Sequence, residues 1–156
     1  VGWFGFNAGS ALSAGTSAGY AMLVTNSATG MALVAWILVE YMDKKKVSVQ
    51  GALSGVVAGL VAITPAAGFV DFPGSLIIGL SAGVICYLAV SYLKVWLKYD
   101  DSLDVFGLHG VGGIVGCLLA GLLANPAIGA ATGALYGNLD QLMAQLISII
   151  VVGAYA

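Results

Sequence analysis

The chain is constrained most strongly by a succession of apolar runs, each about as long as a lipid bilayer is thick. Such runs lie at about 18–41, 74–97 and 102–124, and a shorter one lies at 49–66. A helix needs about 20 residues to cross a hydrocarbon core of ~30 Å. It also satisfies its own backbone hydrogen bonds, which lipid cannot do. The sequence therefore predicts an all-α membrane protein, a polytopic bundle of transmembrane helices.

The composition agrees with a membrane location. Apolar residues make up 60% of the chain and charged residues 8%, whereas soluble domains carry roughly a quarter charged residues. The net charge of −2 gives no reason to expect a nucleic-acid partner. Cys86 and Cys117 both lie within apolar runs, so we expect neither a disulfide framework nor a metal site. We expect no cofactor and no enzymatic activity.

We expect a single transmembrane domain whose first and last helices are incomplete. The expected segments are about 1–12, 18–41, 49–66, 74–97, 102–124 and 139–156. The chain begins in apolar and aromatic residues without a methionine or a basic leader, and it ends in apolar sequence without a cap. These ends predict that residues 1–156 are a fragment of a larger membrane protein.

Glycines spaced by four predict which helix faces pack closely. Gly51, Gly55 and Gly59 lie along one face of the second expected span, and Gly79 and Gly83 lie along one face of the third. Small residues let the backbones of membrane helices approach one another. We therefore expect tight helix contacts at both faces.

The lysines test this arrangement of spans, because they occur in only two connections. They are Lys44, Lys45, Lys46, Lys94 and Lys98. Two crossings separate the two connections, so both must lie on the same side of the membrane. The connections near residues 13, 71 and 130 fall on the other side and contain no lysine or arginine. By the positive-inside rule, the connections with lysines are cytoplasmic.

Three carboxylates stand just before the fourth complete span. Asp101 or Ser102 can cap the start of that helix, and Asp104 then lies in its first turn, where the positive helix end favours a carboxylate. We interpret Asp101, Ser102 and Asp104 as a structural helix cap at the membrane interface. A direct role of these carboxylates in binding substrate is the alternative.

His109, the only histidine, lies about one and a half helical turns beyond Asp104. Polar residues at this depth in a membrane are rare and usually functional. At helical spacing His109 shares a face with Val105, Gly112, Gly113 and Gly116. Because an imidazole can relay a proton, we hypothesise that this face is the wall of a narrow conduit for protons or ammonium. The alternative is a structural histidine bonded to a neighbouring helix.

The first residues form a second unusual stretch. Trp3, Phe4 and Phe6 lead into Ser10 near the end of their helix. Aromatic residues at a membrane interface are commonly anchors. They can also form a cation–π site that a hydroxyl group completes. Both interpretations of this stretch remain open on spacing alone.

Three stretches of the chain, in this order and spacing, resemble the ammonium transporter family (Amt/Mep, related to Rhesus proteins). They are Gly2–Ala11 (GWFGFNAGSA), Gly59–Gly68 (GLVAITPAAG) and Asp101–Gly113 (DSLDVFGLHGVGG). The resemblance extends over essentially the whole chain, and it corresponds to the C-terminal half of the family, from the end of the sixth helix into the eleventh.

The resemblance implies a bundle of eleven helices around a narrow hydrophobic pore, with three subunits and one pore in each. It implies that Ser10 is the hydroxyl of an external vestibule and that Trp3 is a pore-side aromatic of the same binding region. Phe6 would be one ring of a phenylalanine gate, and Val105 and His109 would line the pore. The other gate ring and a first pore histidine belong to the five helices that this sequence does not contain.

The resemblance also implies the activity and the partners. The protein would carry ammonium or ammonia across the plasma membrane, with cation recruitment at the vestibule, deprotonation, and passage past His109. Potassium is rejected because it has no proton to lose. Expected partners are ammonium, the lipid bilayer, two further copies in a homotrimer, and a cytoplasmic regulatory protein of the PII type. Two other hypotheses stay open: an ammonium sensor with a transporter-like membrane domain, or a truncated bundle that is inactive on its own.

Overall fold

The computed structural model describes all of residues 1–156, and it contains helices and connections only. The α-helices are α1 (Gly2–Gly9), α2 (Thr16–Lys44), α3 (Val49–Ile63), α4 (Phe72–Leu88), α5 (Lys94–Leu97), α6 (Val111–Leu123) and α7 (Leu139–Tyr155). Two π-helical turns, η1 (Ala89–Leu93) and η2 (Phe106–Gly110), and a 3₁₀ turn, η3 (Ala134–Tyr136), complete the chain. The predicted all-α fold is confirmed.

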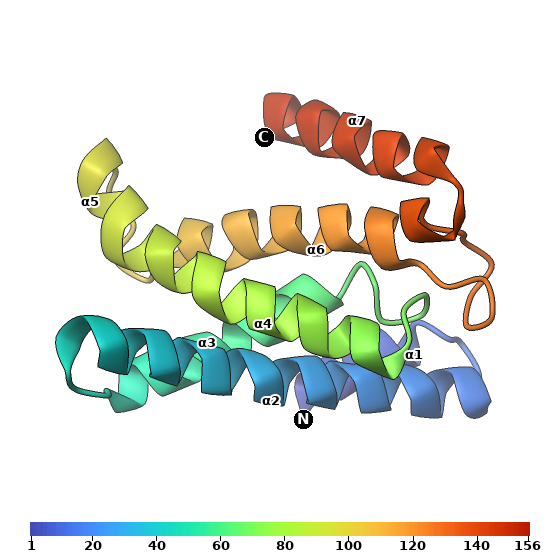
Figure 1. Ribbon diagram of the computed structural model, residues 1–156, viewed down its shortest axis with the longest axis horizontal. Helices are drawn as coiled ribbons and strands as arrows, with labels where there is room; N and C mark the ends of the chain where they lie inside the picture. Colours follow the sequence, from blue (N-terminus) through green and yellow to red (C-terminus); the bar gives the residue numbers. More distant parts are fainter.

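The helices form a layered bundle (Figure 1). α2, α3 and α4 pack against one another, α6 packs on α3 and α4, and α7 packs mainly on α6. α2, the continuous helix Phe72–Leu97 and the continuous helix Phe106–Leu123 are long and apolar enough to cross a membrane. α3 and α7 are shorter apolar helices of 15 and 17 residues.

The fourth complete span starts about three residues later than predicted. The helix begins after Asp104 rather than at Ser102, because Asp104 has a left-handed backbone with φ 56°. The second complete span also ends early, at Ile63 instead of residue 66. Thr64 keeps helical dihedrals, but Pro65 has no backbone N–H with which to continue the helical hydrogen bonds. The other predicted boundaries agree with the helices to within a few residues.

Glycines allow α3 and α4 to approach α2 closely, as their spacing predicted. A Cβ atom placed on Gly59 would lie 2.7 Å from the Cα of Thr29 and 2.8 Å from the carbonyl oxygen of Ala28. A Cβ atom on Gly83 would lie 2.5 Å from the carbonyl oxygen of Ala32. Both glycines therefore stand directly against the backbone of α2, and the prediction of tight helix contacts is confirmed.

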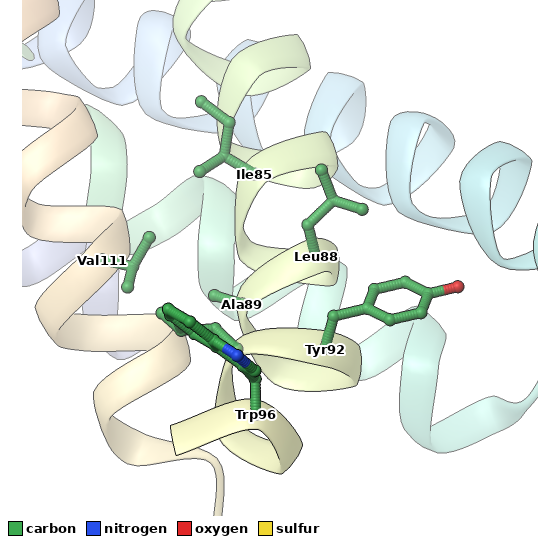
Figure 2. Close-up of a pocket in the computed structure, with 7 residues that line it drawn as sticks. Ile85, Leu88, Ala89, Tyr92, Trp96 and Val111 are labelled. Carbon is green, nitrogen blue, oxygen red and sulfur yellow. The ribbon is translucent and has the colours of Figure 1, made fainter.

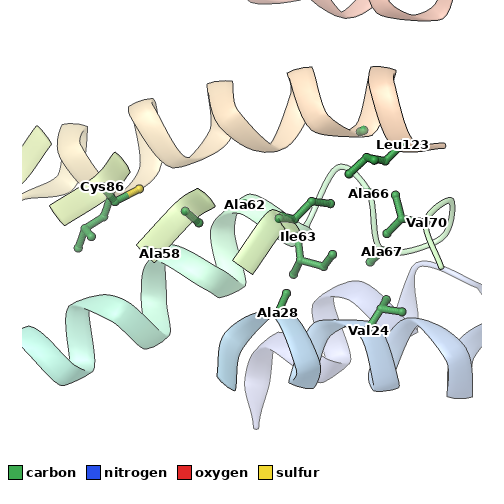
Figure 3. Packing of buried hydrophobic residues seen from close by; sticks show 14 of the residues in the cluster. Val24, Ala28, Ala58, Ala62, Ile63, Ala66, Ala67, Val70, Cys86 and Leu123 are labelled. Atoms are coloured by element: carbon green, nitrogen blue, oxygen red, sulfur yellow. The ribbon is translucent and has the colours of Figure 1, made fainter. Parts of the chain in front are cut away.

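The buried core is built mostly from small side chains (Figure 3). Val24 and Ala28 of α2, Ala62 and Ile63 of α3 and Ile78 of α4 are fully buried at its centre. Such a core leaves little room between the helices. In a membrane, where lipid is as apolar as leucine, close van der Waals packing of this kind holds helices together.

Both connections that carry lysines lie at one end of the bundle (Figure 1). At this end the Asp43 carboxylate accepts hydrogen bonds from the hydroxyls of Tyr87, at 2.5 Å, and Tyr92, at 2.6 Å. The Lys44 ammonium lies over the Tyr87 ring, 5.3 Å from its centroid. The connections at the other end contain Asp71, whose carboxylate accepts a hydrogen bond from the Asn125 amide at 3.1 Å.

Candidate functional site

Two clusters contain the residues that the sequence singled out, and the first lies on α1. The indole of Trp3 donates a hydrogen bond to the Thr64 hydroxyl at 2.8 Å, which fastens α1 to the end of α3. The rings of Trp3 and Phe6 are tilted by 46° with centroids 5.7 Å apart. Phe6 is 63% exposed in this chain. Ser10 is exposed, and its hydroxyl donates to the Phe6 carbonyl oxygen at 2.7 Å.

A buried amide that the sequence did not single out fixes this cluster on α2. The Asn7 side chain donates to the hydroxyl of Thr25 at 3.0 Å, and both groups are buried. Buried polar groups need such partners, since an unpaired one costs about 1–3 kcal/mol. Asn7 and Thr25 therefore hold one face of α1 inward and leave Phe6 and Ser10 outward. An asparagine among aromatic and small residues was the only signal in the sequence.

The second cluster is the start of the helix that carries His109. The Asp101 carboxylate accepts hydrogen bonds from the backbone N–H groups of Val105 and Phe106, both at 2.8 Å. Asp104 does not sit in the first turn; its carboxylate pairs with the Lys94 ammonium at 2.7 Å. Lys94 also donates to the backbone carbonyl of Asp101. Asp101 thus supplies the side-chain cap, while Ser102 is exposed and makes no side-chain hydrogen bond.

Tyr99 joins the same connection from the preceding helix. Its ring meets the ring of Phe106 edge-on, with centroids 5.5 Å apart. Burial raises the pKa of the Tyr99 phenol, and the nearby Asp101 carboxylate raises it further. The aromatic contact and the Lys94 pair together fix the entry into η2.

His109 lies in the π-helical turn η2 and is exposed in this chain. It lines a pocket of about 600 Å³ between η2, α6 and α7. The other lining residues are Phe106, Gly110, Gly113, Ile114, Cys117, Ser148, Ile149, Val152, Gly153 and Ala156. The imidazole makes no hydrogen bond to another part of the chain. Val105 is also half exposed, one residue before η2.

The helix face predicted around His109 is only partly right. Gly113 shares the His109 pocket, but Gly112 lies against Cys86 and Val61, and Gly116 faces the backbone of Ala62. The prediction assumed α-helical spacing, in which 3.6 residues make a turn. The π-helical turn η2 contains one residue more than an α-helical turn, so His109 is rotated relative to the glycines of α6.

A second hollow lies beside η1 (Figure 2). It has a volume of about 420 Å³ and is lined only by apolar and aromatic residues. The hydroxyl of Tyr92 points away from it and donates to Asp43. The groove therefore offers no polar group to a cation and is separate from both clusters.

These features define a helical membrane protein: several apolar helices of spanning length, packed through glycines, with one histidine set in an apolar helix. Comparison with known proteins identifies the family. The model of the Ammonium Transporter Family matches residues 1–156. The chain belongs to the ammonium transporter family.

Several relatives are similar to this chain over nearly its whole length. A putative ammonium transporter of Methanothermobacter thermautotrophicus is 54% identical, over 99% of this chain and 39% of the relative. An ammonium transporter of Aquifex aeolicus is 52% identical, over 99% of this chain and 37% of the relative. The chain thus spans somewhat more than a third of the length of the curated relatives that it matches.

Solved structures share the fold. The crystal structure of Saccharomyces cerevisiae Mep2 superposes with a TM-score of 0.93 at 37% identity, over 99% of this chain and 36% of that one. A structure of a sensor Amt protein superposes with a TM-score of 0.87 at 32% identity, over 96% of this chain and 36% of that one. The folded arrangement of residues 1–156 is therefore that of one part of an ammonium transporter.

Proposed function

We propose that this chain forms part of a pore that carries ammonium or ammonia across the plasma membrane, with His109 on the pore wall. The observation that carries the proposal is the position of this imidazole. It is exposed and unpaired within an apolar helix of spanning length. A structural histidine would be bonded to a neighbouring helix. Membership of the ammonium transporter family supports the same activity.

Ser10, Trp3 and Phe6 form the proposed entrance. The Ser10 hydroxyl gives its only proton to the Phe6 carbonyl, so its lone pairs remain free to accept a hydrogen bond from an ammonium ion. A cation within about 6 Å of an aromatic ring is attracted by the face of the ring. The Trp3 and Phe6 rings are close enough to act on one small cation. The exposed Phe6 ring would act as a gate above the passage.

Energetics then require that a proton is lost before passage. An isolated ion in an apolar medium costs tens of kcal/mol, whereas a neutral hydrogen-bonding group costs about 2–7 kcal/mol. Ammonium can become neutral ammonia, but potassium cannot lose its charge. His109 offers ammonia a hydrogen-bonding partner along the passage, or it receives the separated proton. Val105 would line the pore one turn before it.

The proposal includes the assembly and the topology. Residues 1–156 supply one side of the pore, and the exposed faces of η2 and α1 would be completed by helices outside this chain. The active form is a homotrimer. The end of the bundle that carries Lys44 to Lys46, Lys94 and Lys98 faces the cytoplasm by the positive-inside rule. A regulatory protein of the PII type would bind at that end.

Flux into proteoliposomes tests the proposed function. The full-length protein that carries this chain is reconstituted, and ammonium and potassium gradients are applied in turn. We expect ammonium-dependent flux and no potassium flux. Absence of ammonium flux from folded protein would refute the proposal. The 156-residue chain is measured in parallel, and flux from it alone would refute the inactive-bundle hypothesis.

A second candidate function is ammonium sensing, which the similarity to a sensor Amt protein favours. In that case the same vestibule would bind ammonium, and the membrane domain would pass the signal to a cytoplasmic module. Saturable ammonium binding without flux in the same proteoliposomes would support sensing. Sustained ammonium flux across the membrane, rather than binding alone, would support transport.

A further inference from the structure

The two π-helical turns of this chain pack against each other at the end that carries the lysines. Gly107 of η2 faces Val90 of η1. A Cβ atom on Gly107 would lie 2.7 Å from Cγ2 of Val90 and 3.4 Å from its backbone nitrogen. π-helical turns are rare and occur frequently at functional sites. In this chain two such turns are in direct contact, through Gly107 and Val90.

The contacts next to this pair are separated by different numbers of residues along the two helices. A second close approach brings Gly112 of α6 to Cys86 of α4, where a Cβ atom would lie 3.3 Å from the Sγ atom. From Gly107 to Gly112 is five residues, while from Val90 back to Cys86 is four. Residues five apart on an α-helix point about 140° away from each other. Both glycines can face α4 and η1 only because η2 takes up an extra residue.

A similar spacing shows the extra residue in η1. Tyr87 and Tyr92 are also five apart, yet both hydroxyls reach the Asp43 carboxylate, at 2.5 and 2.6 Å. Contacts on both sides therefore hold each π-helical turn in its register. In η2 these contacts are the Asp101 cap at its start and Gly107 and Gly112 along its inner side.

The register of η2 decides where His109 faces. His109 lies two residues after Gly107 inside the turn, on the side opposite to Val90. If η2 relaxed to an α-helix, the residues before it would rotate by about 100° relative to α6. His109, within the turn, would rotate by part of that angle and leave its present direction.

We infer that Gly107 and Val90 are positioning residues: their contact keeps η2 as a π-helical turn and so aims His109 into the passage. This inference rests on the proposed function, since the role of His109 belongs to it. Gly107 does not itself line the His109 pocket, so its effect on transport would pass through the conformation of the turn.

A complementary pair of substitutions tests the inference in the full-length transporter. Gly107→Ala adds a methyl group that collides with Val90, and we expect the ratio of ammonium to methylammonium flux to change roughly five- to tenfold, about the effect of one lost hydrogen bond. Val90→Ala removes the Cγ2 atom with which this methyl group collides. The double variant Gly107→Ala/Val90→Ala should therefore recover the wild-type ratio. A ratio of fluxes does not depend on how much protein reaches the membrane.

Three further variants make every outcome decisive. Gly30→Ala, at an exposed helical glycine with no atom within 4 Å, is the matched control and should leave the ratio unchanged. Val90→Ile enlarges the same contact from the other side and should act like Gly107→Ala if that variant does not fold. His109→Ala separates the two proposals. If it changes the ratio while Gly107→Ala does not, the positioning role is wrong and the proposed function stands.

Two other outcomes contradict the inference. A double variant that is folded and assembled but as impaired as Gly107→Ala shows that the contact with Val90 is not the cause. An unchanged ratio in His109→Ala would contradict the proposed role of His109 in the pore. If Gly107→Ala changed the ratio at the same time, it would act through a residue other than His109.

Discussion

Replacing Gly59 by alanine should destabilise the bundle, and the structure gives the magnitude. A Cβ atom on Gly59 would have three neighbours in α2 at 2.7, 2.7 and 2.8 Å: the Cβ of Ala32, the Cα of Thr29 and the carbonyl oxygen of Ala28. None of them belongs to a flexible side chain that could turn away. Since ordinary contact begins near 3.4 Å, α2 and α3 must separate by roughly 0.7 Å, and such overpacking costs about 1–3 kcal/mol.

Helix propensity acts in the opposite direction. Alanine is favoured over glycine by about 1 kcal/mol in a helix. Because the collision of Gly59→Ala is with backbone, we expect its cost to lie near the upper end, which leaves a net destabilisation of about 2 kcal/mol. Gly30→Ala has the same gain in propensity but no atom within 4 Å. The control should therefore be as stable as the wild type, or more stable by up to about 1 kcal/mol.

Equilibrium unfolding of both variants in mixed detergent micelles, followed by circular dichroism, measures the difference. A Gly59→Ala protein at least as stable as Gly30→Ala would refute the close approach of α3 to α2. It would also show that the added methyl group is accommodated without moving the helices.

Two further predictions concern hydrogen bonds at the candidate site. Asp101→Ala removes both acceptors of the helix cap, so we expect a loss of about 1–2 kcal/mol in stability and faster hydrogen exchange at Val105 and Phe106; unchanged exchange there would contradict the cap. Trp3→Phe keeps an aromatic ring but loses the donor to Thr64, and thermal unfolding should show a loss of about 1 kcal/mol. Trp96→Phe, at an exposed indole, is its control and should leave stability unchanged.

Much of the bundle follows from elementary patterns in the sequence. Apolar runs of spanning length predict the helices, and glycines at steps of four predict the faces that meet α2. The lysines of two connections predict that these connections share one end of the bundle, where the structure has them (Figure 1). These features depend on burial and charge, and both can be inferred from residue types without knowledge of the contacts between helices.

The π-helical turns could not be predicted in this way. A π-helical turn differs from an α-helical one by a single residue, and the sequence of η2, with glycines on both sides of His109, shows no periodicity that would reveal it. The turn is set by tertiary contacts such as Gly107 with Val90, so the face predicted for Gly112 and Gly116 was wrong.

Polar contacts between helices were missed for a related reason. Asp104 was predicted to favour the helix end by its charge, yet it adopts a left-handed backbone and pairs with Lys94. Trp3 and Thr64 are 61 residues apart in the chain. Such pairs depend on which helix ends meet in space, and a single sequence does not encode that in its spacing.

The most direct test of the proposed function replaces His109 by alanine in the full-length protein and measures ammonium and potassium flux in proteoliposomes. Assembly of the variant is checked by its size in detergent. We predict an assembled protein in which ammonium flux is lost or its selectivity over potassium is changed. An assembled variant with unchanged ammonium flux and unchanged selectivity would contradict the role of His109 in the pore.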